Sequence, residues 1–195
     1  MASRLPMILA SASPRREVLL RQVVEDFKTV PSDAHEVLDG NLTAWEMVQV
    51  NAYRKARAVA KKFPDALVLG ADTLVYLDRE TRLFSKPASL EEAASMLEAL
   101  QGRVHAVITG LCLLHLRTHR QRTFAEWTDV RFHPLNQRQI HDYLKIVNPL
   151  DKAGAYAIQE HGERIVAEIA GSFSNVVGLP VERLRSELRA WYAGS

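Results

Sequence analysis

The chain has 195 residues, of which 47% are hydrophobic and 25% are charged. This composition is typical of a globular protein and excludes a disordered or collagen-like chain. The 25 Lys and Arg residues exceed the 23 Asp and Glu residues by only two, and this net charge of +2 is too small to indicate nucleic-acid binding by itself. The single cysteine excludes a disulfide framework and a multi-cysteine zinc site. No apolar run has the length of a membrane span, and the first residues lack the apolar core of a signal peptide, so we expect a cytoplasmic protein without membrane contact.

The first half of the chain alternates short apolar runs with amphipathic stretches, a pattern typical of α/β folds. We predict strands at residues 7–10, 27–30, 66–70, 73–77 and 82–84. Between the first two strands, Ser13 as N-cap and Pro14 as first helical residue begin a helix that extends to Val24. A capping box at 43–46 begins a second helix, which extends to about residue 62. The remaining polar stretches are a loop and a turn, at residues 31–41 and 78–81.

The second half continues this alternation. A capping box at 89–92 begins a helix that ends at Gly102 as its C-cap. The apolar face of this helix is predicted at Leu90, Ala93, Leu97 and Leu100. The later elements are two strands joined by a polar turn, a helix, a strand and a closing helix, at residues 104–116, 123–132, 136–146, 165–169 and 180–191. No linker is apparent, so we expect a single domain over residues 1–195, with two lobes.

The segment Ser11–Arg16 is a candidate ligand site, because two arginines begin a helix directly after a strand. A helix N-terminus carries a partial positive charge, so Arg15 and Arg16 are unfavourable there unless an anion binds. Backbone N–H groups, the hydroxyls of Ser11 and Ser13, and the two guanidinium groups together could hold a phosphate. The alternative is a pair of solvated arginines on a surface turn.

Asp72 is the second candidate, because it is a lone acid between two apolar strand segments. Ligands of α/β proteins bind at strand ends, and a carboxylate there can hold a divalent metal or take a proton from water. The alternative is an ordinary turn aspartate. Asp33 and Glu36, in the polar loop, could supply a further carboxylate, or they are simply solvated.

Three further side chains could contact a ligand. Lys55 lies among other basic residues on an amphipathic helix, and Pro87 holds Lys86 in an extended backbone. Either lysine could bind phosphate or be an ordinary solvated side chain. Gln159 ends a run of small residues at 151–159 that permits close backbone approach, and its amide could bind a base edge. The alternative for this run is a tightly packed strand crossing.

Several common catalytic motifs are absent from the sequence. There is no P-loop, no G-x-G-x-x-G, no G-x-S-x-G and no H-E-x-x-H. Cys112 lies in a long apolar strand, so we expect it in the core rather than as a nucleophile.

A set of short segments, in this order, resembles the Maf-like proteins. The segments are Ser11–Arg16, Lys55-Ala56, Gly70–Thr73, Lys86-Pro87, 102–110, 151–159 and 171–180, which together span nearly the whole chain. Maf-like proteins are nucleoside triphosphate pyrophosphatases, which cleave between the α and β phosphates and release a monophosphate and pyrophosphate. The resemblance implies an α/β fold similar to that of the inosine triphosphate pyrophosphatases. This fold has a mixed, elongated sheet with helices and a central cleft between two lobes.

The resemblance also implies a substrate. The dTTP/UTP branch of the family has an Arg directly after Ser-Pro, a Thr after Gly-Ala-Asp, and a run that ends in Gln. This chain has Arg15, Thr73 and Gln159 at those places. The branch that acts on 7-methyl-GTP typically has a Trp before the Arg pair and Gln in place of the Thr, and it lacks the run. We therefore expect hydrolysis of dTTP and UTP, or of modified pyrimidine nucleotides, with these three residues selecting the substrate.

By the same resemblance Asp72 is the proton acceptor, and Asp72 with Glu36 holds a divalent cation, Mg²⁺ or Mn²⁺, on the triphosphate. The residues expected to bind phosphate are Ser11, Ser13, Arg16, Lys55 and Lys86. The family often has a further acid where this chain has His35. This difference leaves open how many carboxylates hold the metal.

Three alternative functions remain at this point. One is a 7-methyl-GTP pyrophosphatase. Another is a non-enzymatic regulator of septum formation, a role linked to Maf-like proteins that nothing else in the sequence supports. The third is a nonspecific nucleic-acid binder, which the weak net charge and the lack of an aromatic-rich basic surface disfavour. We expect a nucleoside triphosphate as ligand, no nucleic-acid partner and, from the resemblance, a homodimer.

Overall fold

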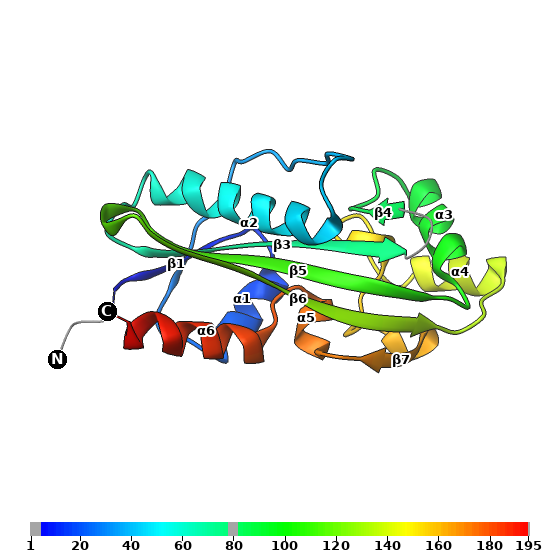
Figure 1. Ribbon diagram of the computed structural model, residues 1–195. Helices are drawn as coiled ribbons and strands as arrows, with labels where there is room; N and C mark the ends of the chain where they lie inside the picture. Colours follow the sequence, from blue (N-terminus) through cyan, green and yellow to red (C-terminus); the bar gives the residue numbers. More distant parts are fainter. Residues whose placement is uncertain (1–4, 78–81, 195) are drawn as a thin grey trace. The chain divides into compact units, whose positions relative to one another are not determined.

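The computed structural model describes residues 5–77 and 82–194. Within these residues one sheet has seven strands in the order β2-β1-β3-β5-β6-β7, with β4 also paired to β3 (Figure 1). The strands are β1 (Met7–Ala10), β2 (Lys28–Thr29), β3 (Leu67–Leu77), β4 (Arg82–Phe84), β5 (Val104–His115), β6 (Arg120–Phe132) and β7 (Val166–Ala170). Because β1 runs parallel to β2 and β3, while β4 and β7 run antiparallel to their neighbours, the sheet is mixed, as predicted.

The described residues also form six α-helices, and the chain divides into two compact units. The helices are α1 (Pro14–Arg21), α2 (Ala44–Ala60), α3 (Leu90–Leu100), α4 (Gln137–Leu144), α5 (Phe173–Val177) and α6 (Val181–Ala193). The first unit comprises Met1–Asp72, Thr109–Glu126 and Gly178–Ser195, and the second comprises Thr73–Ile108 and Trp127–Val177. Each unit is described by itself below. The single domain over residues 1–195 and the central cleft stay predictions.

The beginning of α1 forms as predicted, but its end does not. The Ser13 hydroxyl accepts a hydrogen bond from the Arg16 backbone N–H at 3.5 Å, and Pro14 is the first helical residue. The helix ends at Arg21 rather than Val24. The buried apolar face of α1 covers a single turn, so tertiary packing does not extend the helix further.

Strand β3 is continuous, whereas the sequence predicted two strands with Asp72 between them. The strand changes partners along its length: it pairs with β1 as far as Gly70 and with β4 from Val75 onward. Asp72 therefore lies just beyond the end of β1, inside β3. The buried acid does not break the strand because polar side chains from α2 pair with it.

Helix α3 differs from its prediction in two details. The Ser89 hydroxyl caps the Glu92 N–H, but the Glu92 carboxylate accepts from the Ala88 N–H, so the capping box is only half formed. Leu90 is 53% exposed because it precedes the turn that packs into the core. The other apolar residues of the predicted face are buried: Ala93, Leu97 and Leu100. Gly102 follows the helix with a φ of +67°, the left-handed backbone that glycine favours after a helix.

One turn and one short helix also differ from the predicted elements. The β5–β6 turn is shorter than predicted, since Leu116–Thr118 forms a 3₁₀ turn and β6 begins at Arg120. Helix α5 has five residues, too few for a helical period to be visible in the sequence. Its start is stabilised by the Ser172 hydroxyl, which accepts from the Asn175 N–H at 3.2 Å. The turn predicted at 78–81 lies outside the described residues.

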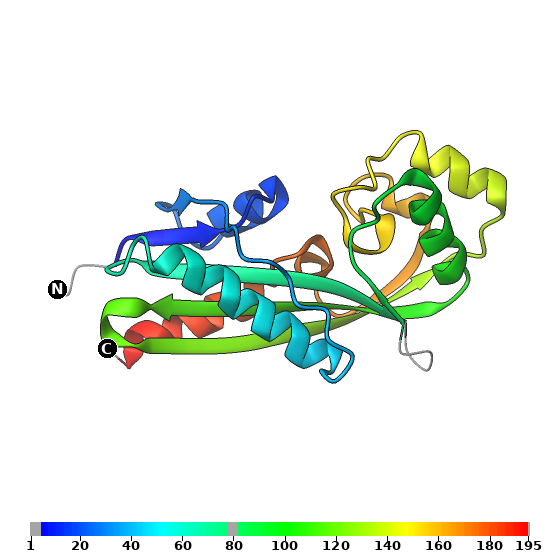
Figure 2. The same ribbon diagram turned by 90° about the horizontal axis from the view of Figure 1, so that it is seen from above.

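In the first unit α2 covers one face of the sheet, while α1 and α6 cover the other (Figures 1 and 2). Helix α2 begins with the predicted capping box, and its small residues pack directly on the strands. A Cβ atom at Gly70 would lie 2.1 Å from the Ala52 carbonyl oxygen, and one at Gly110 would lie 2.4 Å from that of Val48. The helix backbone therefore rests on the backbones of β3 and β5. The core here consists of Ile8, Ala10, Ala52, Ala56, Val59, Ala60, Ala66, Val68, Cys112 and Leu114.

The second unit has its own core, in which aromatic residues meet. The buried His105 ring lies edge-on to Phe132 and Tyr156, with its Nε2 2.9 Å from the Tyr156 hydroxyl. Burial lowers the pKa of His105 to about 3, so this imidazole is neutral at physiological pH. The Tyr143 hydroxyl donates to the Ala157 carbonyl and accepts from the Ala157 N–H. These bonds fix the backbone just before the candidate residue Gln159.

One expectation about the core agrees with the structure. Cys112 is buried in the core of the first unit, and burial raises the pKa of its thiol to about 11, so the thiol stays protonated and unreactive at neutral pH. Among residues 5–77 and 82–194, no helix combines the length and apolar character needed to span a bilayer.

We predict that Gly70→Ala lowers the free energy of unfolding by about 3 kcal/mol, because the added methyl group meets helix backbone that cannot move alone. Urea denaturation measures this loss. The control is Gly40→Ala, whose Cβ has no atom within 4 Å and which should change stability by less than about 0.5 kcal/mol. Equal effects for the two variants would contradict the backbone contact.

Candidate active site

An acid–lysine–acid cluster, consisting of Glu36, Lys55 and Asp72, lies in the first unit. Asp72 is on β3, Lys55 is on α2, and Glu36 is in the loop that precedes α2. The Lys55 Nζ lies 2.6 Å from Asp72 Oδ1 and 2.6 Å from Glu36 Oε1. The side chain of Asp72 is 4% exposed and that of Lys55 is 14% exposed, whereas that of Glu36 is 36% exposed. The cluster thus extends from the buried strand to the surface, with Asp72 at its inner end.

Burial and charge act in opposite directions on Asp72. Burial raises the pKa of this carboxyl, and the nearby Glu36 charge raises it further. The Lys55 ammonium and, more weakly, the Arg16 guanidinium lower the pKa, but burial is the larger effect. A carboxyl group with a raised pKa holds a proton more tightly than an ordinary aspartate, which suits a proton acceptor.

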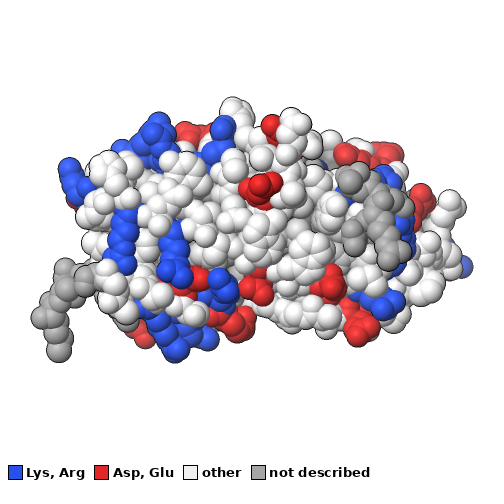
Figure 3. Space-filling model, in the orientation of Figure 1, with Lys and Arg blue, Asp and Glu red and all other residues white. Residues whose placement is uncertain are grey.

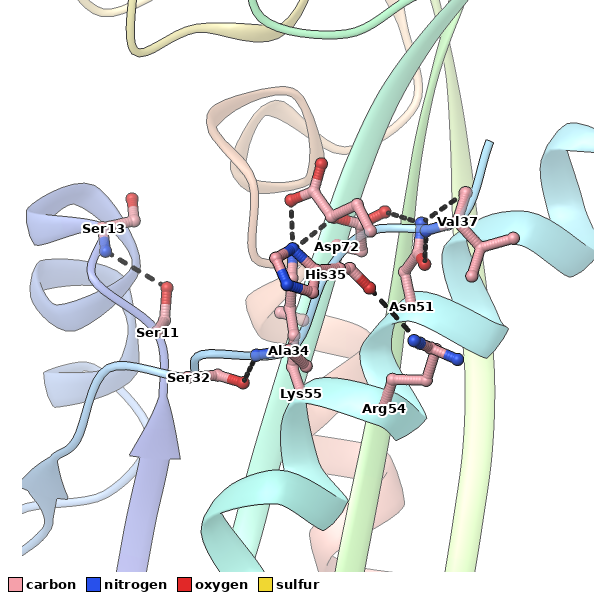
Figure 4. A network of polar contacts seen from close by, with 12 residues as sticks. Ser11, Ser13, Ser32, Ala34, His35, Val37, Asn51, Arg54, Lys55 and Asp72 are labelled. Carbon is pink, nitrogen blue, oxygen red and sulfur yellow. Dashed lines mark hydrogen bonds and ion pairs between the residues drawn. The ribbon is translucent and has the colours of Figure 1, made fainter. Parts of the chain in front are cut away.

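Asn51 belongs to the same network, although the sequence did not single it out. Its Nδ2 lies 3.0 Å from Asp72 Oδ2 and 3.1 Å from the Val37 carbonyl oxygen, and its Oδ1 accepts from the Val37 N–H at 2.7 Å (Figure 4). Asn51 is 1% exposed. The sequence does contain one indication of this role, because Asn51 is a polar residue one turn before Lys55 on a helix face that is otherwise apolar. A buried amide at that place has to find polar partners.

The segment Ser11–Arg16 is held by contacts within the protein. Arg16 Nε donates to the Gly178 carbonyl at 2.9 Å, and Arg16 Nη1 donates to the Ala71 carbonyl at 3.0 Å. The Ser11 hydroxyl accepts from the Ser13 N–H at 3.1 Å. Arg16 therefore fixes the backbone of β3 directly before Asp72. Its own pKa is lowered, chiefly by burial and further by the charge of its half-buried neighbour Arg15.

Asp33 and His35 of the preceding loop have separate contacts. Asp33 pairs with the exposed Lys62 at 3.4 Å, and the carbonyl oxygen of His35 accepts from Arg54 Nε at 3.3 Å. In the described part of this loop, Glu36 is the acid that contacts Lys55.

Three predicted substrate residues belong to the second unit. Thr73 follows Asp72 on β3, so its side chain points to the opposite face of the strand. Lys86 is exposed, and Gln159 is exposed with its Nε2 3.2 Å from Glu160 Oε1. Their roles in phosphate binding and substrate selection stay predictions, as do those of the residues in the first unit.

The cluster fits a divalent cation that is shared with a ligand. Within residues 5–77 and 82–194, no three His, Cys, Asp or Glu side chains gather as a ligand set. Two carboxylates do converge, on the Lys55 ammonium. Mg²⁺ is commonly held by one or two carboxylates together with substrate phosphates and water, which is the donor set that Glu36 and Asp72 could begin.

Comparisons with known proteins agree with the resemblance predicted from the sequence. The family model described as Maf-like protein matches residues 6–191. The dTTP/UTP pyrophosphatase of Carboxydothermus hydrogenoformans is 42% identical, over 94% of this chain and 97% of that protein. That of Bacillus velezensis is 45% identical, over 94% of this chain and 95% of that protein. A HAM1 protein structure from Coxiella burnetii has a TM-score of 0.52 at 14% identity and covers 95% of this chain and 99% of that chain, a likeness of fold alone.

We predict that Lys55→Met lowers the free energy of unfolding by about 3 kcal/mol at pH 8, because it leaves the buried Asp72 carboxylate without its ammonium partner. In this variant the folded-state pKa of Asp72 rises further above its unfolded value. Stability should therefore be highest below the unfolded pKa and fall as the pH rises through the folded one.

Denaturation of the variant and the wild type between pH 5 and pH 8 measures both effects. Lys62→Met is the matched control, since its exposed pair with Asp33 should contribute less than about 1 kcal/mol. A Lys55→Met protein as stable as this control at every pH would contradict the importance of the buried pair.

Proposed function

The chain belongs to the Maf-like protein family, and from this premise we propose that it is a pyrophosphatase of dTTP and UTP. The reaction consumes water and the nucleoside triphosphate and releases the nucleoside monophosphate and pyrophosphate. The observation that carries the proposal is the acid–lysine–acid cluster, which places a buried carboxyl of raised pKa beside a cationic side chain. The substrate is supported by the relatives of 42% and 45% identity, both of which are named dTTP/UTP pyrophosphatase.

In this proposal Asp72 accepts the proton of the attacking water. The water oxygen forms a bond to one phosphorus of the α–β phosphoanhydride, and the bond from that phosphorus to the bridging oxygen breaks. Lys55 holds the Asp72 carboxylate in place through its 2.6 Å contact, so the acceptor is oriented before the substrate binds. The proton then passes from Asp72 to solvent.

Positive side chains would stabilise the negative charge that grows on the leaving pyrophosphate. We assign this role to Arg16, Lys55 and Lys86, with the Ser11 and Ser13 hydroxyls binding phosphate oxygens. The position of Arg16 supports the assignment. Its guanidinium donates hydrogen bonds to two backbone carbonyls, and its charge lowers the pKa of Asp72.

We also propose that Glu36 and Asp72 hold Mg²⁺ or Mn²⁺ together with the triphosphate. When bound, such a cation neutralises phosphate charge and polarises the bond to be cleaved. The support is the convergence of the two carboxylates on one position that a cationic group already occupies.

Substrate selection is assigned to Arg15, Thr73 and Gln159. The support is the match of these residues to the dTTP/UTP branch, together with the names of the two relatives. The proposal includes modified pyrimidine nucleotides as substrates. A 7-methyl-GTP pyrophosphatase and a non-enzymatic regulator of septum formation gain no observation of their own.

The remaining expectations concern location and partners. A cytoplasmic location is supported by the single cysteine, and the homodimer rests on the family resemblance alone. The proposal includes no nucleic-acid partner. On the face in Figure 3, Lys and Arg side chains and Asp and Glu side chains both occur, so the face does not carry basic residues alone.

The first test of the function is a product assay. We expect the purified protein, with Mg²⁺ or Mn²⁺, to convert UTP to UMP and dTTP to dTMP, each with pyrophosphate, as resolved by chromatography. Asp72→Asn should lower turnover by about 100-fold or more, because the amide cannot accept the proton. Asp33→Asn is the control, since this exposed acid should not affect turnover. Turnover of 7-methyl-GTP alone would contradict the substrate, and an active Asp72→Asn variant would contradict the mechanism.

The second test concerns Gln159. If its amide binds the base, Gln159→Ala should raise the KM for UTP by about tenfold and lower kcat by less than about twofold, since a binding contact common to substrate and transition state is lost. Gln121→Ala, which removes an exposed amide in the first unit, is the control. An unchanged KM for UTP would show that Gln159 does not recognise the base.

A further inference from the structure

We infer that Asn51 is a positioning residue that holds the Asp72 carboxylate and the loop carrying Glu36 in one fixed arrangement. The part of the inference that concerns catalysis rests on the proposed function, since it takes Asp72 as the proton acceptor. It adds a residue that neither the family resemblance nor the predicted site includes.

The orientation of the Asn51 amide follows from its partners. The Val37 N–H is a donor, so only the Asn51 oxygen can face it, at 2.7 Å. The two N–H bonds of the amide then point to two acceptors, the Val37 carbonyl at 3.1 Å and Asp72 Oδ2 at 3.0 Å. A flipped amide would place its oxygen against both acceptors and its nitrogen against a donor. All the polar groups of this buried side chain are therefore used.

Asn51 and Lys55 together fix the orientation of the Asp72 carboxylate. Lys55 contacts Oδ1 and Asn51 contacts Oδ2, so the two carboxylate oxygens have separate partners. One contact alone would allow the carboxylate plane to rotate about its terminal torsion, which has a broad energy minimum. Two contacts from one helix face, one turn apart, fix the plane. Lys55 places a positive charge beside the Asp72 carboxylate, whereas the neutral amide of Asn51 orients the carboxylate without adding charge.

On the loop side, α2 contacts three consecutive residues. Arg54 donates to the His35 carbonyl, Lys55 to the Glu36 carboxylate, and Asn51 exchanges two bonds with Val37 (Figure 4). The Arg54 contact is exposed, whereas Asn51 is 1% exposed. The loop has no helix or strand of its own at these residues, so the Asn51 bonds are its buried attachment beside Glu36.

Two substitutions of Asn51 separate its contact with Asp72 from its contacts with the loop at Val37. Asn51→Leu keeps the branching and the number of side-chain heavy atoms and removes all three bonds. Asn51→Asp keeps an acceptor for the Val37 N–H but loses the donor to Asp72 and places a second carboxylate beside it. Gln49→Leu is the control, because it removes an exposed amide from the same helix, where it donates to the Trp45 carbonyl.

Hydrogen exchange, UTP kinetics and inhibitor affinity are measured on folded protein, with the melting temperature as the check of folding. Amide hydrogen exchange at Val37 should become at least about tenfold faster in Asn51→Leu and stay near the wild-type rate in Asn51→Asp and Gln49→Leu. Turnover of UTP should fall by roughly 10- to 100-fold in both Asn51 variants, since a misplaced acceptor loses reaction geometry. The KM for UTP and the affinity for α,β-methylene-UTP should change by less than about threefold, because Asn51 binds no substrate group.

The outcomes separate the inference from the proposed function. A folded Asn51→Leu with unchanged Val37 exchange, or either Asn51 variant with wild-type kcat, would overturn the inference. If Asn51→Leu does not fold, Asn51→Asp decides by its kcat, because it is isosteric with the wild-type side chain. A wild-type protein that hydrolyses no nucleoside triphosphate would overturn the proposed function, and Val37 exchange would still decide whether Asn51 holds the loop.

Discussion

The close approach of α2 to the sheet brings Lys55 of the acid–lysine–acid cluster within reach of Asp72. Gly70 and Gly110 bring the helix backbone onto the backbones of β3 and β5, where any side chain would collide with helix carbonyl groups. With larger residues at these two positions, side chains would fill the space between the helix and the sheet. Because they do not, Lys55 reaches Asp72 at 2.6 Å, only two residues beyond the glycine contact. Two residues without side chains thus set the geometry of a site to which they contribute no chemistry.

The charges of the cluster are better suited to reactivity than to stability. A buried ion pair is a weak source of stability, because desolvation of both partners offsets their attraction. Here burial dominates over the attraction of Lys55, and the Asp72 carboxyl keeps a raised pKa. A second lysine in place of Asn51 would oppose this effect, whereas a neutral amide orients the carboxylate without adding charge. The cluster therefore combines a fixed orientation with a retained proton affinity.

Sequence reasoning found the parts of the fold and site that depend on local chemistry. Ser13 and Pro14 marked the start of α1, the capping box marked that of α2, and the isolated acid at Asp72 marked the inner end of the cluster. The predicted break in β3 was wrong, because a polar residue inside a strand is satisfied by partners that are distant in sequence. Asn51 was missed for the same reason: its role is set by Val37 and Asp72, 14 and 21 residues away. Such partners are known only once the helix is placed on the sheet.

The attachment at Val37 has a consequence for how the protein can change over generations. Asn51 bonds to the backbone N–H and carbonyl of Val37 and to none of its side-chain atoms. Every amino acid except proline offers these two groups, so the side chain at this loop position is free to drift while the neighbouring acid stays within reach of Lys55. The helix position has no such freedom, because a side chain there needs one acceptor and two donors at a fixed length. We therefore expect related sequences to vary at the position of Val37 and to keep asparagine at the position of Asn51.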